Sequence, residues 1–193
     1  MPLILASASP IRRALLVQAG IDHEVAPATV DEAAIKKLHD KAEVAAVELA
    51  EAKALQISAE RPADWIIGSD SIVTVEGRMF DKPADRDEAQ AHLRLFSGKD
   101  MILTSAVALA RGGTIDWSLA DRAKLKVRAL SNRFIDDYLE SEWPGVSYCV
   151  GVFRMEGRGV ALFDSIEGSH FTILGLPLVP LLGALRGRGL VQS

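Results

Sequence analysis

Two long segments constrain the fold of this chain most, because each contains two extended runs separated by a tight turn. The first, "ADWIIGSDSIVTVEGRMF" at residues 63–80, turns at Glu76-Gly77, and the second, at residues 101–120, turns at Gly112-Gly113. Their β-branched and apolar content is typical of strands, and the glycines permit two-residue turns. Both segments therefore predict β-hairpins, so the sheet contains antiparallel pairs.

Predicted helices alternate with these strands. Residues 2–7 form a short apolar run that predicts a buried strand, and Pro10 and Gly20 suit the entrance and exit of a helix that follows it. Further helices are expected from Asp40 and Asp85, which have capping-box partners at Glu43 and Glu88, and from Ser131 and Pro177; two more strands are expected at 148–156 and 159–166. The mixture favours an α/β fold with a mixed sheet and a cleft.

Composition limits the classes of partner. With 193 residues and 49% apolar content, the chain suits one domain, or two small lobes that share a core. A net charge of −4 provides no general attraction for nucleic acid. The single cysteine, Cys149, cannot form an internal disulfide, and no signal peptide or membrane span is apparent. We expect a cytoplasmic protein that binds neither nucleic acid nor membrane.

Arg12 and Arg13 stand at the predicted start of a helix, where the macrodipole disfavours cations. The bend before them carries Ser7 and Ser9, and such a bend presents N–H and hydroxyl groups that suit a phosphate. Two guanidinium groups would complete the site, since arginine grips phosphate oxygens bidentately. Ordinary surface arginines are the alternative explanation for the pair.

Asp70 is an acid within an otherwise apolar strand, on the same face as Gly68, which leaves room for a ligand. A buried carboxylate needs a cation, a metal or a hydrogen-bond network, although a structural role in a turn is the alternative. Lys53 interrupts the apolar face of its helix, so it either snorkels to water or points into a cleft.

Other charged residues carry weaker signals. Glu32, Lys82 and Glu156 lie at predicted loop or strand ends, where solvated charge is the ordinary explanation. Lys124, Lys126 and Arg128 share one strand face, but no aromatic residues alternate with them. A solvated face is therefore favoured over a nucleic-acid surface.

Six motifs occur in an order that resembles the Maf family of nucleotide pyrophosphatases. They are "ASASPIRRALL", "LAEAKA", "GSD", "DKP", "EGRG" and "GLPL", which together span most of the chain. The resemblance implies a single domain over residues 1–193, with an extended, largely antiparallel central sheet flanked by helices and a cleft between two lobes. It also implies hydrolysis of nucleoside triphosphates to monophosphate and diphosphate, a divalent cation (Mg²⁺ or Mn²⁺) and a possible homodimer.

The resemblance also assigns residue roles by position. Asp70 is implied as proton acceptor, with Lys53 and Lys82 as further catalytic residues, and Asp70 with Glu32 as metal ligands. The residues implied around the triphosphate are Ser7, Ser9, Arg12 and Arg13.

Three positions bear on the choice of base. Ile11, Ser71 and Glu156 stand where many relatives carry Arg, Thr and Gln, and "CVGVFRMEG" resembles the branch that prefers 7-methyl-GTP. A carboxylate at Glu156 can accept two hydrogen bonds from a guanine edge, and Ile11 can pack on the base.

The alternative from another functional class is a non-catalytic nucleotide-binding regulator of septum formation.

Overall fold

A mixed sheet is the central feature of the computed structural model, which describes residues 2–192. In this range the sheet has seven strands. Six of them follow the order β2-β1-β3-β5-β6-β7, and the seventh, β4, pairs with β3. The strands are β1 (Leu3–Leu5), β2 (Glu24–Val25), β3 (Trp65–Val75), β4 (Arg78–Phe80), β5 (Asp100–Arg111), β6 (Thr114–Val127) and β7 (Phe163–Glu167).

Strand pairing agrees with the predicted mixed, largely antiparallel sheet. Strand β1 pairs in parallel with both β2 and β3, whereas β4 and β7 pair antiparallel with β3 and β6. The predicted turn between β3 and β4 is confirmed, since Glu76 and Gly77 both have positive φ angles, 52° and 78°. The predicted turn at Gly112-Gly113, between β5 and β6, is also confirmed.

Helices occupy the segments between strands. They are α1 (Pro10–Gln18), α2 (Glu32–Lys37), α3 (Ala42–Glu60), α4 (Arg86–Phe96), α5 (Asn132–Glu142), α6 (His170–Ile173) and α7 (Leu178–Arg186), with 3₁₀ turns at Gly145–Tyr148 and Arg158–Leu162. The sequence did not predict α2 and α6, which have six and four residues. None of the helices in residues 2–192 has the length and apolar character needed to cross a membrane.

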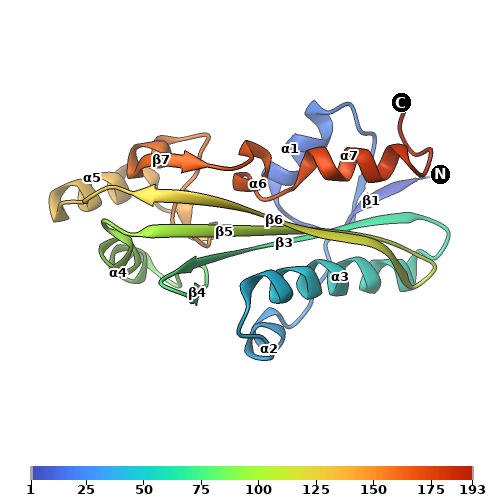
Figure 1. The fold of residues 1–193 in the computed structure, drawn as a ribbon, viewed down its shortest axis with the longest axis horizontal. Helices are drawn as coiled ribbons and strands as arrows, with labels where there is room; N and C mark the ends of the chain where they lie inside the picture. Colours follow the sequence, from blue (N-terminus) through green and yellow to red (C-terminus); the bar gives the residue numbers. More distant parts are fainter. Residues whose placement is uncertain (1, 193) are drawn as a thin grey trace. The chain divides into compact units, whose positions relative to one another are not determined.

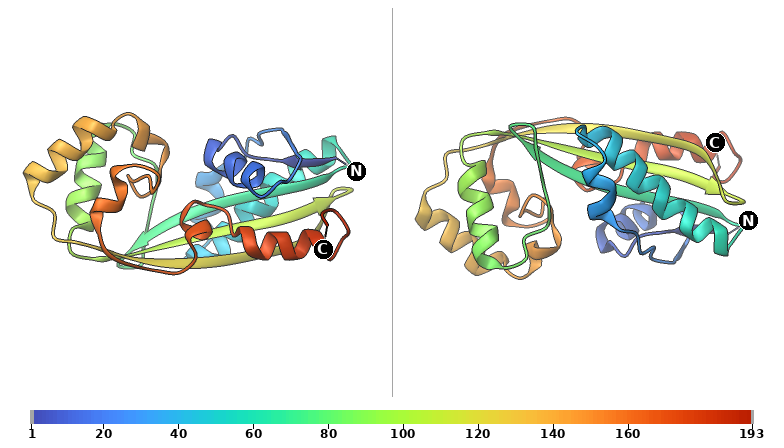
Figure 2. Two further views of the ribbon diagram at one scale, coloured as in Figure 1. Left: turned by 90° about the horizontal axis from the view of Figure 1, so that it is seen from above. Right: turned by 90° about the horizontal axis from the view of Figure 1, so that it is seen from below.

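The chain divides into two compact units. The first contains residues up to 71, residues 104–121 and those from 169 onward, and the second contains residues 72–103 and 122–168. In the first unit, α1 and α7 cover one face of the strands and α3 covers the other, as Figures 1 and 2 show. Helices α4 and α5 belong to the second unit.

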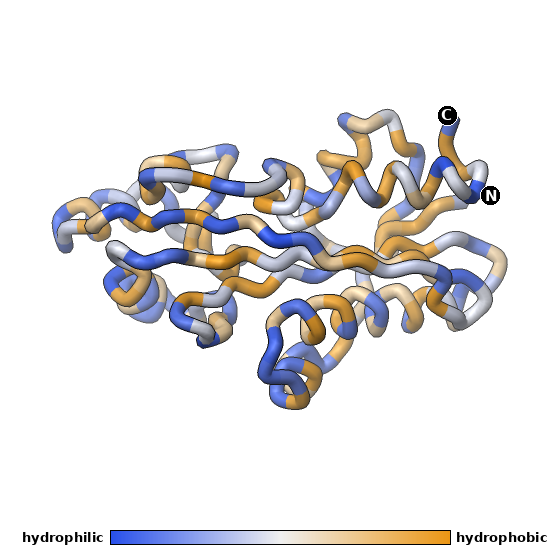
Figure 3. The backbone as a smooth tube through the Cα atoms, in the orientation of Figure 1, coloured by the Kyte–Doolittle hydropathy of each residue, from blue (hydrophilic) through white to orange (hydrophobic). Residues whose placement is uncertain are grey.

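The core of the first unit is built from β1, α1 and α7. Leu5, Leu16, Ile67 and Leu181 are fully buried in this cluster, and Leu109 of β5 joins them. Hydrophobic residues recur along these elements in Figure 3, where they are orange. Burial of this apolar surface holds α1 and α7 against the strands, which fixes the loops at the ends of these elements.

Helix α3 approaches β3 very closely at Gly68. A Cβ atom at this position would lie 2.0 Å from the carbonyl oxygen of Ala50 and 2.9 Å from the Cβ of Ala54. The expectation that Gly68 leaves room for a ligand is therefore wrong, because α3 fills the space. The close contact instead brings the buried face of α3 against the strand that carries Asp70.

The two predicted capping boxes have different outcomes. The Asp85 side chain accepts a hydrogen bond from the Glu88 N–H, as predicted, while the Glu88 carboxylate accepts one from the Ala84 N–H. The prediction at Asp40 is wrong, because α3 begins at Ala42 and Lys41 takes the N-cap position without a side-chain hydrogen bond. Asp40 thus lies one residue outside the position that a capping side chain needs.

The predicted strand at 148–156 is wrong, and the following strand is β7, at Phe163–Glu167. Val152 is buried with a positive φ of 55°, and its carbonyl oxygen accepts a hydrogen bond from the Tyr138 hydroxyl. Arg154 is bound by the Glu142 carboxylate at 3.0 Å. These contacts with α5 hold the segment in turns, so its apolar residues are buried without a ladder partner.

Replacing Gly68 by alanine is expected to lower the free energy of unfolding by about 3 kcal/mol, because the backbone of α3 must move away. The matched control is Gly183→Ala in α7, where an added Cβ meets nothing within 4 Å. This control should be neutral or stabilising by about 0.5–1 kcal/mol through helix propensity. Urea unfolding measures both changes, and equal stability of the two variants would contradict the predicted close contact.

Candidate active site

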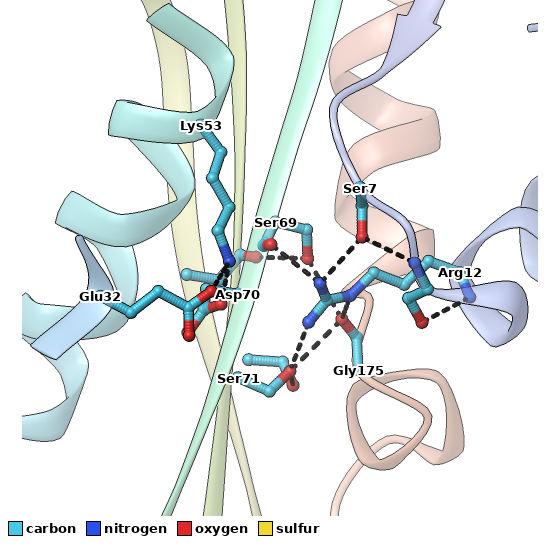
Figure 4. Close-up of polar contacts among 11 residues, drawn as sticks. Ser7, Arg12, Glu32, Lys53, Ser69, Asp70, Ser71 and Gly175 are labelled. Carbon is cyan, nitrogen blue, oxygen red and sulfur yellow. Dashed lines mark hydrogen bonds and ion pairs between the residues drawn. The ribbon is translucent and has the colours of Figure 1, made fainter. Parts of the chain in front are cut away.

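Two groups of polar side chains approach β3 from its two faces, at Ser69, Asp70 and Ser71. Successive side chains of a strand point to opposite faces, so Asp70 faces α3, while Ser69 and Ser71 face the side of α1. Figure 4 shows Lys53 and Glu32 on one side of the strand and Arg12 on the other. Strand β1 pairs with β3 only at residues 65–67, and β4 only at 73–75, so Asp70 lies between these pairings.

On the α3 side, Lys53 bridges two carboxylates. Its Nζ donates hydrogen bonds to Asp70 Oδ1 and to Glu32 Oε1, both at 2.6 Å. The side chains of Lys53 and Asp70 are only 10% and 8% exposed, whereas that of Glu32 is 37% exposed. Lys53 therefore does not snorkel to water, and the cation that a buried Asp70 requires comes from α3.

Local structure explains how Glu32 reaches this pair. Glu32 is the first residue of α2, and Asp31 caps that helix by accepting a hydrogen bond from the Ala34 N–H. The short helix sets the direction in which the Glu32 side chain leaves the backbone. A signal for α2 was present in the sequence, because Asp31 precedes the run "EAAIKK" as a capping residue would.

On the other face of β3, the Arg12 guanidinium is bound by groups of the protein. Nε donates to the Gly175 carbonyl at 2.8 Å, and NH1 donates to the Ser69 carbonyl at 2.9 Å and the Ser7 hydroxyl at 3.3 Å. NH2 donates to the Ser71 hydroxyl at 3.0 Å. The expected bidentate grip of Arg12 on a phosphate would have to break some of these bonds.

The charges on the two faces of β3 act on each other. Burial lowers the pKa of the Arg12 guanidinium, and the negative charges of Asp70 and Glu32 act in the opposite direction. Arginine nevertheless stays protonated at any physiological pH. The guanidinium and the two carboxylates thus belong to one local electrostatic environment.

The serine bend before α1 is partly used by the protein itself. Ser9 is the N-cap of α1 and its hydroxyl accepts a hydrogen bond from the Arg12 N–H, while the Ser7 hydroxyl accepts one from the Ser9 N–H. A hydroxyl accepts through its lone pairs and donates through its hydrogen, so these contacts leave both hydroxyl hydrogens for other acceptors. Arg13 follows in the same helix with an exposed side chain, and Ile11 is half-buried.

A chain of hydroxyl groups continues from Arg12. The Ser105 hydroxyl donates to the Thr172 carbonyl at 2.8 Å, so the 2.8 Å contact between Ser71 and Ser105 has Ser71 as its donor. The Ser69 hydroxyl lies 2.8 Å from the Ala106 carbonyl and 3.1 Å from that of Gly175. Sequence reasoning gave no role to Ser69, Ser105, Thr172 or Gly175, although Gly175 opens the quoted motif "GLPL".

Lys82 and Glu156 both belong to the second unit. Their side chains are exposed, and both carry charge near Cys149. Burial raises the pKa of the Cys149 thiol to about 11; the negative charge of Glu156 adds to the increase, while Arg154 and Lys82 oppose it. Lys82 and Glu156 therefore both lie close enough to Cys149 to act on the charge of its thiol.

The three basic residues at the end of β6 and just after it have partners within the protein. Asp100 of β5 binds Lys124 at 2.9 Å and Lys126 at 3.4 Å. Arg128 lies over the ring of Phe134, 4.0 Å from its centroid, and donates to the Ala161 carbonyl. The solvated-face interpretation of these three residues stays a prediction.

Removal of the bridging cation tests the Lys53 contacts. Lys53→Met should lower the free energy of unfolding at pH 7 by about 3 kcal/mol, since it leaves the buried Asp70 carboxylate without its cation. Adding Asp70→Asn should recover part of this loss, because the double variant no longer buries a carboxylate that has lost its cation. Urea unfolding of the wild type, both single variants and the double variant measures the coupling, and strictly additive losses would contradict it.

Comparison with known proteins gives one consistent result. The family model "Maf-like protein" matches residues 2–188. A nucleoside triphosphate pyrophosphatase of Nitrobacter winogradskyi is 42% identical, covering 99% of this chain and 96% of its own. A 7-methyl-GTP pyrophosphatase of Rhizobium etli is 43% identical, covering 99% and 98%.

A solved structure, a nucleoside-triphosphatase (dITP/XTP pyrophosphatase) of Mycobacterium abscessus, aligns over 98% of this chain and 96% of its own at 16% identity and a TM-score of 0.45. Family membership rests on the sequence matches, which extend over nearly the whole chain. This chain belongs to the Maf-like protein family.

Proposed function

We propose that this protein hydrolyses nucleoside triphosphates to the monophosphate and diphosphate. The observation that carries the proposal is the pairing of Asp70 and Glu32 on one ammonium group, beside a serine and arginine bend on the other face of β3. The names of the relatives from Nitrobacter winogradskyi and Rhizobium etli, both pyrophosphatases, support the same reaction.

The charges of the site suit a polyphosphate. A nucleoside triphosphate carries about four negative charges near neutral pH, and phosphoryl transfer depends mainly on positioning and charge neutralisation. Lys53 and Arg12 supply positive charge beside β3, and Arg13 is exposed at the first turns of α1. The hydroxyl hydrogens of Ser7 and Ser9 add donors for phosphate oxygens.

The carboxylates fit a divalent cation. Asp70 Oδ1 and Glu32 Oε1 both bind the Lys53 ammonium group at 2.6 Å, so the two carboxylates lie close enough together to share a second cation. Mg²⁺ commonly binds one or two carboxylates together with substrate phosphates and water, and Mn²⁺ accepts similar ligands. Asp70 and Glu32 would hold such an ion, which would neutralise charge on the phosphates.

Asp70 is the proposed proton acceptor. Lys53 binds Oδ1, so we assign Oδ2 as the atom that orients the attacking water and takes its proton. As the water oxygen bonds to the α-phosphorus, the bond from that phosphorus to the bridging oxygen breaks and diphosphate leaves. Lys53 keeps the carboxylate in place during this step, and Lys82 is proposed to bind the departing phosphates.

The proposed substrate is a guanine-type nucleotide, with 7-methyl-GTP as the leading candidate. Glu156 would accept hydrogen bonds from the N1–H and amino groups of guanine, and Ile11 would pack on the base. The 7-methyl-GTP pyrophosphatase of Rhizobium etli supports this choice. Ser71 stays a proposed specificity position, although its hydroxyl hydrogen is used by Ser105.

Asp70→Asn should strongly reduce turnover while retaining nucleotide binding. Loss of the proton acceptor is expected to lower kcat by about 1,000-fold, because general bases contribute between about 10² and 10⁴. Diphosphate release from a panel of triphosphates with Mg²⁺ measures turnover, and calorimetric titration with nucleotide measures binding. A wild-type protein that binds nucleotide but releases no diphosphate from any triphosphate would instead support the nucleotide-binding regulator.

Glu156→Gln should affect guanine nucleotides selectively. An amide can accept only one of the two hydrogen bonds proposed, so kcat/KM for GTP and 7-methyl-GTP should fall by about 10- to 100-fold. Hydrolysis of UTP and dTTP by the same variant is the internal control and should change little. Equal losses on all four nucleotides would contradict base recognition by Glu156.

A further inference from the structure

We propose that Arg12 is a positioning residue that holds the Asp70 segment of β3 in its reactive geometry, which leaves to Arg13 the phosphate binding that the family resemblance implies for both arginines. This inference rests on the proposed pyrophosphatase function and divides the work of the arginine pair. Figure 4 shows the arrangement from which it follows, with the Arg12 guanidinium enclosed by Ser7, Ser69, Ser71 and Gly175.

Most of the N–H donors of Arg12 are already used within the protein. A guanidinium has five N–H groups, and four of them are engaged by the bonds to Gly175, Ser69, Ser7 and Ser71. Two of these acceptors are backbone carbonyls, which have fixed positions once the backbone is folded. A bidentate phosphate contact needs two free N–H groups, so Arg12 in this arrangement cannot provide it without losing a bond to the protein.

Arg12 connects the two residues beside Asp70 with other segments of the chain. Ser69 and Ser71 flank Asp70 directly, so two of the four bonds fix the strand on either side of the proposed proton acceptor. The bond to Ser7 holds the loop that leads into α1, and the bond to Gly175 holds the turn before α7. The guanidinium thus joins three segments that are distant in the sequence at the position of Asp70.

The turn at Gly175 packs tightly on the Arg12 guanidinium. Gly175 has a φ of +93°, and a Cβ atom there would lie 3.3 Å from the Ser71 hydroxyl and 3.6 Å from Arg12 Nε and NH2. The turn therefore needs glycine for its backbone conformation and for its close approach to both side chains. Ser71 is held from its other side by Ser105, whose hydroxyl is bound to Thr172.

Arg13, the next residue of α1, differs from Arg12 in its exposure to solvent. Its side chain is exposed and extends from the first turns of α1, whose N-cap is Ser9. The guanidinium of an exposed arginine is available to bind phosphate oxygens through two parallel N–H groups. Arg13 is therefore assigned to phosphate binding, and Arg12 is assigned to holding Asp70 in position for the chemical step.

The experiment compares kcat and KM for Arg12→Lys and Arg13→Lys, with an active nucleotide and Mg²⁺. Lysine keeps the charge but cannot bind the four acceptors, so Arg12→Lys should lower kcat by about 100-fold with little change in KM, as for a displacement of about 1 Å. Arg13→Lys should mainly raise KM, by about tenfold. Arg133→Lys, an exposed arginine of α5 outside the site, is the unchanged control.

A double-variant cycle separates positioning from a general loss of structure. Ser71→Ala removes one acceptor and should lower kcat by about tenfold, and adding it to Arg12→Lys should cost little more, because both changes break the same contact. Circular dichroism and the thermal midpoint confirm that the assays use folded protein, and Ser71→Ala alone gives the test if Arg12→Lys does not fold.

The outcomes are distinct. A raised KM with normal kcat for Arg12→Lys, or losses in kcat that multiply independently in the double variant, would overturn the positioning role. If Ser71→Ala leaves kcat unchanged, the proposal is likewise wrong. Absence of diphosphate release from wild-type protein would instead defeat the proposed pyrophosphatase function on which the inference rests.

Discussion

The burial of a carboxylate on a central strand is the constraint on which the site depends. Asp70 is 6% exposed, and a charge so far from water requires a cation within hydrogen-bonding distance. Lys53 meets this need only because α3 packs directly on β3 at Gly68, where no side chain separates the two backbones. The close contact between helix and strand is therefore also the basis of the electrostatics of the site.

The two faces of β3 perform different tasks in this structure. The face toward α3 gathers opposite charges, with Lys53 between Asp70 and Glu32. The face toward α1 gathers hydroxyl and carbonyl groups around Arg12, and these groups fix the strand itself. A carboxylate held in this way keeps a fixed orientation, which is the form of preorganisation that the proposed catalysis by positioning requires.

Much of the architecture was predictable because its signals are local. Turns such as Glu76-Gly77 need positive φ angles, and the Asp85 cap and Pro10 entrance depend on residues close in the sequence. The predictions of secondary structure that were wrong concern two segments, residues 148–156 and the helix start at Asp40. At 148–156, contacts with α5 override the strand pattern, and at Asp40 the helix starts one residue later than the capping side chain requires.

The sequence by itself determined the mixed α/β fold and the family, because these follow from local periodicity and ordered motifs. Only the tertiary structure decided which partners these residues have. It pairs Lys53 with Asp70 and Glu32, and it binds Arg12 to Ser69, Ser71 and Gly175, up to 163 positions away in the chain. The reason is physical: burial and hydrogen bonding depend on which elements meet in space, and spacing along the chain does not specify those meetings.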